Sequence, residues 1–344
     1  MHTRAASWLR HRLGRAVVLS YALALILPAP GLWLRRPHPL PPSHLPLHTA
    51  PLLLSLMLFS AGLQVPVSAL GALLRRPKAL LAGLVLHLAI PLAVVPFVAF
   101  LLRRTPDADG GSGLLTAMIL VVAMPVAAGA TVWTDKGEGD QPTMVGLVLA
   151  STLLSPLTTP VLLATLSPLL SGGYAHTLAA TGRLAEGGFA LTAVVLPCAA
   201  GLLCALVLPA RCLGRLVTAV APSAMAGSLV LTYVNASGAL GSVLTRPRPL
   251  LFAAALAVAA LVCLLSFVLG RVAARLLRLE AATASSLTLA CGMNNSSASA
   301  VLITASLPGK PHLLLPVLAY GLLQKTAANR IVTRLRPAPV AAGA

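Results

Sequence analysis

Residues 283–306 read TASSLTLACGMNNSSASAVLITAS, a stretch long enough to cross a membrane but interrupted in its middle by polar side chains. One crossing needs about 20 mainly apolar residues. Asn294, Asn295, Ser296 and Ser297 are unfavourable in hydrocarbon unless they meet polar partners or water. The pattern predicts a transmembrane helix that is broken at this cluster and that forms a functional site there. A close helix crossing through small residues is the alternative interpretation.

A second apolar stretch, residues 114–133 (LLTAMILVVAMPVAAGATVW), also contains helix-breaking residues near its middle. Pro125 removes a backbone donor and clashes with the preceding turn, and the small residues around Gly129 do little to hold the helix straight. Pro125 alone favours a simple kink. The two interruptions nevertheless lie at matching offsets in the two halves of the chain, which is typical of transporter binding sites. We therefore expect Pro125, Gly129 and Thr131 to share a site with the second cluster.

The chemistry of two such breaks suits an ion or an anionic substrate. The N-termini of the half-helices offer free N–H groups and positive dipole ends to an anion, and the unwound carbonyls offer ligands to a cation. A further candidate site residue is Asn235, a polar residue on the seventh predicted span that could line the cavity from the opposite side.

Composition excludes an ordinary soluble domain. Charged residues make up 9% of the 344 residues and apolar residues 58%, whereas soluble domains carry about 25% charged residues. The formal charge of +18 is spread along the loops, which favours basic membrane anchors over a nucleic-acid partner. The apolar stretches hold no nucleophile with a neighbouring base and no cluster of metal ligands, so we expect no enzyme activity and no metal.

The predicted fold is an all-α polytopic membrane protein of about ten transmembrane helices in two inverted five-helix repeats. Residues 1–14 are the expected cytoplasmic N-terminus, 15–171 the first repeat and 187–334 the second. Lys and Arg are roughly twice as frequent on the side of the N-terminus, which predicts that both termini are cytoplasmic in the plasma or inner membrane. The spans are predicted at 15–34, 49–68, 79–102, 113–134, 142–170, 187–209, 214–236, 249–270, 283–306 and 311–333.

Several motifs resemble the bile acid:sodium symporter family. The segment from Pro125 to Pro160, with Gly139-Asp140 and the run STLLSPLTTP at 151–160, is similar to the family's fourth and fifth helices. The segment GMNNS at 292–296 resembles its ninth-helix signature, and Arg76-Pro77-Lys78-Ala79 resembles the start of its third helix. The resemblance implies a core domain of spans 3–5 and 8–10, a panel domain of spans 1, 2, 6 and 7, crossing broken helices 4 and 9, and substrate between the two domains.

Alignment with the family also implies where coupling ions bind. It assigns cation or proton coupling to His87, Thr131, Met293 and Asn294. Several sodium ligands of the family are replaced, most notably the shared ninth-helix glutamate by Ala290, and all seven acidic residues lie in or beside loops. Because a hard cation needs about five or six oxygen ligands, ordinary two-sodium coupling is in doubt. His87 is either a proton carrier or substrate contact, or a neutral histidine in a packed core.

The function predicted from these observations is secondary transport of small organic anions by alternating access around the crossing of helices 4 and 9. We expect no cofactor other than a coupling ion, with the small organic anion and the lipid bilayer as partners and no nucleic acid. The alternative is a non-transporting, degenerate membrane module that binds or senses such an anion.

Overall fold

A computed structural model describes residues 15–36, 38–39, 46–66, 71, 77–103, 111–245, 249–307 and 309–335 of the chain. The predicted cytoplasmic N-terminus, residues 1–14, lies outside the described residues, as does Arg76 at the start of the family's third-helix motif.

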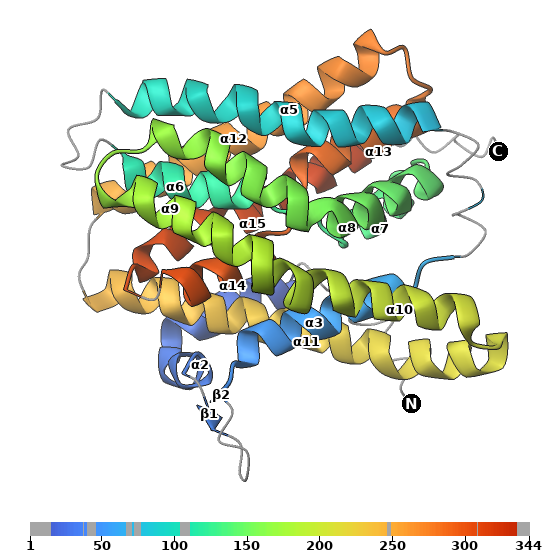
Figure 1. The fold of residues 1–344 in the computed structure, drawn as a ribbon, viewed down its shortest axis with the longest axis horizontal. Coiled ribbons are helices and arrows are strands. Elements are labelled where there is room, and N and C mark those ends of the chain that lie inside the picture. Colours follow the sequence, from blue (N-terminus) through green and yellow to red (C-terminus); the bar gives the residue numbers. More distant parts are fainter. Residues whose placement is uncertain are drawn as a thin grey trace, which may run out of the picture.

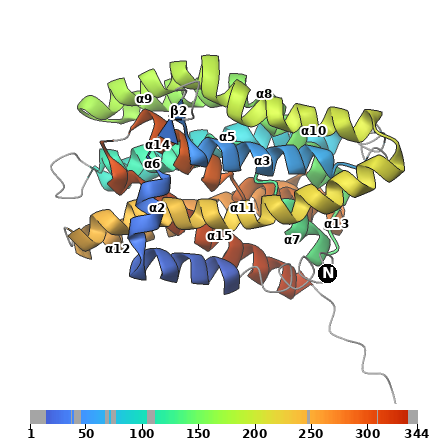
Figure 2. The ribbon, with the colours of Figure 1, turned by 90° about the horizontal axis from the view of Figure 1, so that it is seen from below.

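The chain folds into an elongated bundle whose long helices run in roughly the same direction (Figures 1 and 2). The long helices are α5 (Pro77–Leu102), α8 (Gln141–Leu166), α11 (Ala210–Thr245), α12 (Pro249–Leu276) and α15 (Leu314–Leu335). At 1.5 Å per residue, a helix of 26 residues such as α5 is about 39 Å long. That length exceeds the hydrocarbon core of a bilayer, which is about 30 Å thick.

Shorter elements complete the bundle. The helices are α2 (Pro28–Leu34), α3 (Thr49–Leu63), α6 (Ser112–Val122), α7 (Ala130–Lys136), α9 (Gly173–Leu184), α10 (Leu196–Val207), α13 (Ala281–Gly292) and α14 (Ser296–Ser306). A π-helical segment, η2 (Ala185–Val195), joins α9 to α10, and two short 3-10 turns are η1 (Ser167–Leu169) and η3 (Pro311–Leu313). The strands of the described part are β1 (His38–Pro39) and β2 (Pro46–Leu47), which pair antiparallel.

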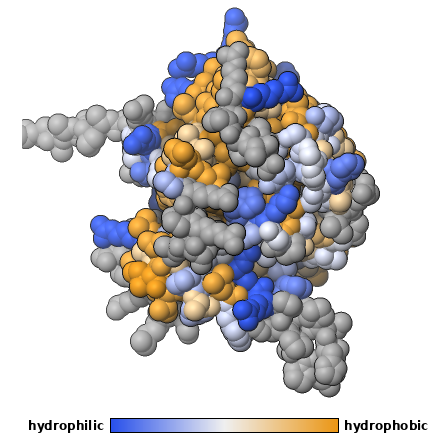
Figure 3. Space-filling view, turned by 90° about the vertical axis from the view of Figure 1, so that its left-hand side faces the viewer, coloured by the Kyte–Doolittle hydropathy of each residue, from blue (hydrophilic) through white to orange (hydrophobic). Residues whose placement is uncertain are grey.

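Five helices of the described part are long and apolar enough to cross a membrane, or six if the helix Arg15–Ile26 and α2 are counted as one bent span. The five are Pro77–Leu102, Gln141–Leu169, Gly188–Val207, Ala210–Leu240 and Pro249–Leu276, so α15 is not among them. This supports a multi-pass α-helical membrane protein. Large apolar side chains such as Leu81, Val85, Leu157 and Leu250 are exposed on the outside of the long helices, where lipid can cover them. Seen from one end, the bundle shows both hydrophobic flanks and hydrophilic residues (Figure 3). Ten spans and an inverted repeat remain predictions.

Two segments differ from the expected spans. The first predicted span, 15–34, is two helices that meet at 97° between Ile26 and Pro28, where a proline occupies the first turn of α2. The connection expected at 171–186 is helical from Gly173 onward. The reason is an apolar face in which Tyr174 and Leu178, four residues apart, are both buried.

The helices pack in two groups. In the first, α3 packs against α10 and α11, and α11 also packs against α2. Gly62 of α3 and Gly201 of α10 allow this approach, because a Cβ on either glycine would collide with the backbone of the other helix. In the second group, α12 packs against α5, α13 and α15, and α14 packs against α15.

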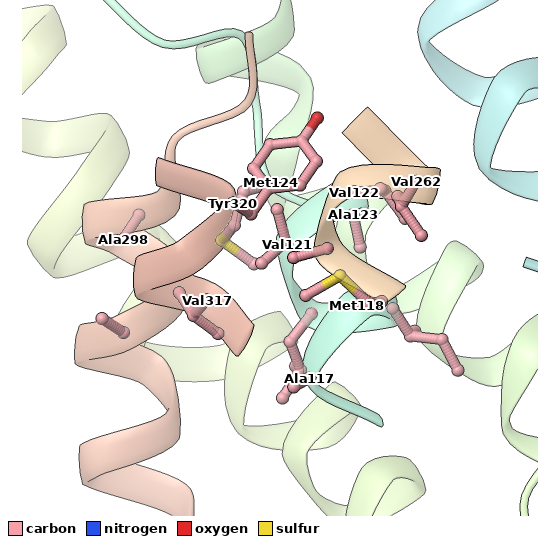
Figure 4. Close-up of a cluster of buried hydrophobic side chains, with 14 of the residues drawn as sticks. Ala117, Met118, Val121, Val122, Ala123, Met124, Val262, Ala298, Val317 and Tyr320 are labelled. Atoms are coloured by element: carbon pink, nitrogen blue, oxygen red, sulfur yellow. The ribbon is translucent and has the colours of Figure 1, made fainter. Parts of the chain in front are cut away.

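Helix α6 lies at the centre of the second group. Every residue from Leu114 to Val122 is buried. Figure 4 shows side chains of α6, including Met118 and Val121, between Val262 of α12 on one side and Val317 of α15 on the other. Because α6 has almost no surface left for lipid or water, its C-terminal end is held firmly at the centre of the molecule.

Candidate functional site

The chain crosses itself where two helix pairs are interrupted. Helix α6 ends at Val122 and α7 begins at Ala130, and α13 ends at Gly292 and α14 begins at Ser296. The two extended interruptions form an antiparallel bridge between Val126 and Asn294. The Ala127 N–H donates to the Met293 carbonyl at 2.8 Å, and the Asn295 N–H donates to the Pro125 carbonyl at 2.9 Å. Each interruption therefore satisfies backbone groups that the other leaves without a helical partner.

Helix α8 supports the first interruption with two hydroxyl groups. The Val126 N–H donates to Ser151 Oγ at 3.1 Å, and Thr159 Oγ1 donates to the Ala123 carbonyl at 2.8 Å. Both side chains are buried. The proline-containing segment is therefore held on one side by the second interruption and on the other by α8.

The second interruption is tied to α15 through Tyr320. The Asn294 side-chain amide donates to the Tyr320 hydroxyl at 2.9 Å, and that hydroxyl donates to the Gly292 carbonyl at 3.0 Å. Tyr320 is fully buried. Figure 4 shows its ring at the edge of the buried cluster, with the hydroxyl pointing away from Val317 and Met118. A single phenol thus bonds both a side chain of the break and the last turn of α13.

Helix α14 begins with a regular capping arrangement. The Asn295 side-chain oxygen accepts a bond from the Ala298 N–H at 3.1 Å, which is the usual N-cap interaction. Ser296 and Ser297 follow, each partly exposed. Gln324 of α15 donates to Ser296 Oγ at 3.4 Å, while its buried side-chain carbonyl has no hydrogen-bond partner among the described residues.

The remaining predicted residues lie farther from the crossing bonds. Gly129 is exposed and a Cβ there would meet nothing within 4 Å. Thr131 Oγ1 bonds the Ala128 carbonyl within its own turn, and the Thr131 carbonyl accepts from the Gln141 side chain. Asn235 is buried on α11, and its side-chain oxygen has no hydrogen-bond partner among the described residues. Among the described residues, no hydrogen bond joins the Asn235 side chain to the interruptions.

His87 lies next to the crossing. It is 7% exposed on α5 and borders a cavity of about 10 Å³, which is room for about one water molecule. The wall is formed by α5, α6, α12 and the end of α13; its residues are His87, Ile90, Pro91, Val122, Ser266, Cys291 and Asn294. The structure thus brings His87 and Asn294 to one cavity.

Away from the cavity, Asp140 links the two helix pairs. Its carboxylate accepts bonds from the Thr143 N–H at 3.2 Å and the Thr143 hydroxyl at 2.7 Å, so it caps α8. It also accepts from Thr283 of α13 at 3.1 Å, and Ser286 donates to its backbone carbonyl. This acidic residue therefore binds the start of α13 to the start of α8.

Sequence reasoning missed Tyr320, Gln324 and Ser266 as contributors to this site. A signal existed for the first two, because Tyr320 and Gln324 are polar side chains four residues apart in an apolar span, and such a pair lies on one helix face. Ser266 carried no comparable signal, since an isolated serine in a membrane helix usually bonds the carbonyl four residues earlier, as it does here with Val262.

The fold and the crossing define a multi-pass α-helical membrane protein with two interrupted helices paired at its centre. The chain belongs to the sodium bile acid symporter family, whose model matches residues 51–246. Members of this family are membrane transporters of bile acids and related organic anions. The matched residues include the first interruption and α8, whereas the second interruption lies beyond them. No curated protein matches the chain.

Proposed function

We propose that this protein is a secondary transporter of small organic anions that works by alternating access around the crossing. The observation that carries the proposal is the backbone bridge between Val126 and Asn294. Interrupted helices are tolerated at membrane depth only where they are buried in protein or line a water-filled path. Two of them paired in the core of a member of a transporter family are best explained as a substrate site.

The packing supports a core domain and a panel domain. The core would contain α5 to α8 and α12 to α15, from spans 3–5 and 8–10, and the panel would contain the helix Arg15–Ile26, α2, α3, α10 and α11, from spans 1, 2, 6 and 7. Contacts within each group are extensive, and the groups meet where α8 packs against η2, where α11 packs against α15 and where α3 packs against α14. The first helix begins and α15 ends toward the same end of the bundle (Figure 2), in keeping with an even number of crossings, two inverted repeats at 15–171 and 187–334, and both termini in the cytoplasm.

The anion would bind at the start of α14. Asn295, Ser296 and Ser297 offer amide and hydroxyl donors there, and the positive end of the helix dipole favours a negative charge. Pro125 and Gly129 would form the opposite wall, with Thr131 beside them, and the panel would contribute Asn235, whose side-chain oxygen has no hydrogen-bond partner among the described residues. The partly exposed state of Ser296 and Ser297 supports access for a ligand.

Sodium fits the cavity beside His87 poorly. A hard cation of this kind requires about five or six oxygen ligands, and the lining residues supply side-chain oxygens from Ser266 and Asn294 alone. The Met293 carbonyl already accepts from the Ala127 N–H, and Met293 is not among the residues that line this cavity. We therefore propose that anion transport is coupled to a cation other than sodium, or to no cation.

The test is uptake into proteoliposomes that contain the purified full chain. Radiolabelled cholate, taurocholate and benzoate are added outside, with and without sodium and pH gradients, and protein-free liposomes give the background. Saturable uptake of at least one anion supports the proposal. Binding without uptake under every gradient would instead identify a membrane binding or sensing module.

A matched pair of variants on α14 locates the anion. Ser297→Asp places a negative charge at the start of the helix, and Ser306→Asp places the same charge at its other end. We expect Ser297→Asp to lower uptake at least about tenfold through repulsion of the anion, while Ser306→Asp retains most of it. Equal losses in the two variants would argue against a site at the start of α14.

A further inference from the structure

His87 is a buried titratable side chain whose role the crossing bonds do not explain. It is 7% exposed, and among the described residues no hydrogen-bond partner reaches its ring nitrogens. The ring faces the cavity of about 10 Å³ that Ser266 and Asn294 also line. A site of this size with several polar groups holds a water molecule or a proton-bearing group, and excludes an organic ligand.

The helices around His87 carry no negative charge within their bounds. Helix α5 packs against α6, α8, α12 and α13, and α6 and α8 contain no titratable residue. The α12 helix contributes Cys263, Arg271 and Arg275, of which both arginines are exposed. The α13 helix contributes Cys291, a lining residue of the cavity. No carboxylate among the described residues of these four helices can therefore neutralise a positive charge on His87.

Hydrogen-bonded polar side chains connect the cavity to the crossing. Asn294 lines the cavity and bonds Tyr320 of α15, and the next residue, Asn295, caps α14. Lys325 lies five residues after Tyr320 on α15. Its charge is positive, so it cannot serve as the counter-charge of a protonated His87. Since the helices packed against α5 offer no carboxylate within their bounds, the counter-charge in this proposal is the organic anion that would bind at the start of α14.

We propose that His87 binds the proton that this transporter carries together with its organic anion. The inference rests on the proposed function, since the anion is the missing counter-charge. A buried imidazolium without a counter-charge is costly, and a buried anion without one is costly as well. Each therefore favours the binding of the other, and by linkage the favourable effect is the same in both directions.

The proton enters as a simple acid–base step. A ring nitrogen with a free lone pair accepts a proton delivered from the aqueous phase by a hydronium ion, which becomes water, and the ring returns the proton to water on the other side of the membrane after the anion leaves. A monovalent anion then crosses with one proton and no net charge moves. Because the proton strengthens anion binding, the affinity for the anion falls by up to about tenfold for each pH unit as His87 loses its proton, until it reaches the lower affinity of the unprotonated form.

The first experiment measures proton uptake directly. Purified full-length protein in weakly buffered detergent solution receives cholate, taurocholate or benzoate, and a pH indicator follows the medium while equilibrium binding of the labelled anion is measured in parallel. We expect about one proton to be taken up for each anion bound by the unmodified protein. Anion binding without proton uptake would overturn the proton proposal and leave the anion transporter standing.

The second experiment uses His87→Gln with His176→Gln as its matched control, because His176 is an exposed histidine on α9. In proteoliposomes with the membrane potential clamped, an inward proton gradient should raise initial uptake at least about tenfold in the unmodified protein and in His176→Gln. His87→Gln should bind the anion without proton uptake and should show no response to the gradient. An unchanged gradient response in His87→Gln would contradict the assignment. Failure of every anion to bind would overturn the transporter proposal itself.

Discussion

At the scale of single residues, the buried hydroxyl of Tyr320 makes two hydrogen bonds that hold the second interruption. Its hydroxyl accepts from Asn294 and donates to the Gly292 carbonyl, so one oxygen atom joins α15 to the end of α13 and to a side chain of the break that follows it. Buried polar groups cost little when paired and much when a partner is removed. The phenol therefore helps to hold the second interruption in place, together with the backbone bonds to the first interruption.

Tyr320→Phe should destabilise the protein and impair transport together. The change removes one oxygen and leaves the Asn294 amide and the Gly292 carbonyl without their partner, at a cost of about 1–3 kcal/mol. We expect a lower midpoint of thermal unfolding in detergent and uptake reduced several-fold. Tyr233→Phe is the control, because the Tyr233 hydroxyl bonds the Leu27 carbonyl away from the crossing. Similar losses of uptake in the two variants would argue against a special role for Tyr320.

The first interruption depends in the same way on Thr159, whose hydroxyl donates to the buried Ala123 carbonyl. Thr159→Val keeps the shape of the side chain and removes the donor, so the free energy of unfolding should fall by about 1–3 kcal/mol. Thr158→Val is a neighbouring control, because the Thr158 hydroxyl bonds Leu154 of its own helix. Thermal unfolding of both variants checks this, and equal stability would show that the Ala123 bond contributes little.

At the scale of helices, close packing in the first group depends on residues without side chains. Gly62 and Gly201 face the backbone of the opposite helix in a reciprocal arrangement, so that α3 and α10 approach as closely as two helices can. Association of helices in lipid relies on such packing, because lipid is as apolar as the helices and provides no hydrophobic force between them. The contact between α3 and α10 therefore needs glycine at both positions.

Gly201→Leu should separate α3 from α10. The added side chain would collide with the Phe59 backbone, and overpacking of this kind typically costs about 1–3 kcal/mol or more. Gly214→Leu is the control, since a Cβ at Gly214 meets nothing within 4 Å. We expect a lowered unfolding midpoint and poor yield for Gly201→Leu only, measured by thermal unfolding and by size-exclusion chromatography.

The sequence predicted some residues of the site and not others. Polar residues in an apolar span pointed to Asn294 and Asn295, because hydrocarbon makes such residues costly. The pairing of the breaks with Ser151 and Tyr320 could not be predicted, since it depends on which helices lie beside each other, and spacing within one helix does not contain that information. The extra helix from Gly173 was missed because its apolar face, with Tyr174 and Leu178 buried, is shorter than a membrane span.

At the scale of the whole molecule, the arrangement in the membrane can be tested without any substitution. Cys212 is the one exposed cysteine of the described residues, at the start of α11, while Cys198, Cys263 and Cys291 are buried. Ten spans with cytoplasmic termini place Cys212 on the cytoplasmic side. The position of a single native thiol therefore reports the orientation of the chain.

A membrane-impermeant maleimide should label Cys212 in inside-out vesicles and leave it unlabelled in intact cells. Mass spectrometry of the labelled peptide identifies the site, and Cys212→Ser should remove the signal. Labelling from the outer face of intact cells would contradict the predicted topology, and with it either the number of spans or the side on which the termini lie.

The bridge between the two interruptions also has a consequence for how the protein is made. The Pro125 carbonyl is satisfied by Asn295, a residue that leaves the ribosome 170 positions later. Because synthesis adds about 5–20 residues per second, Asn295 is made roughly 10–30 s after Pro125. During that interval the nascent first half carries unpaired backbone groups at membrane depth, so water or an insertion factor has to cover them until the second half arrives.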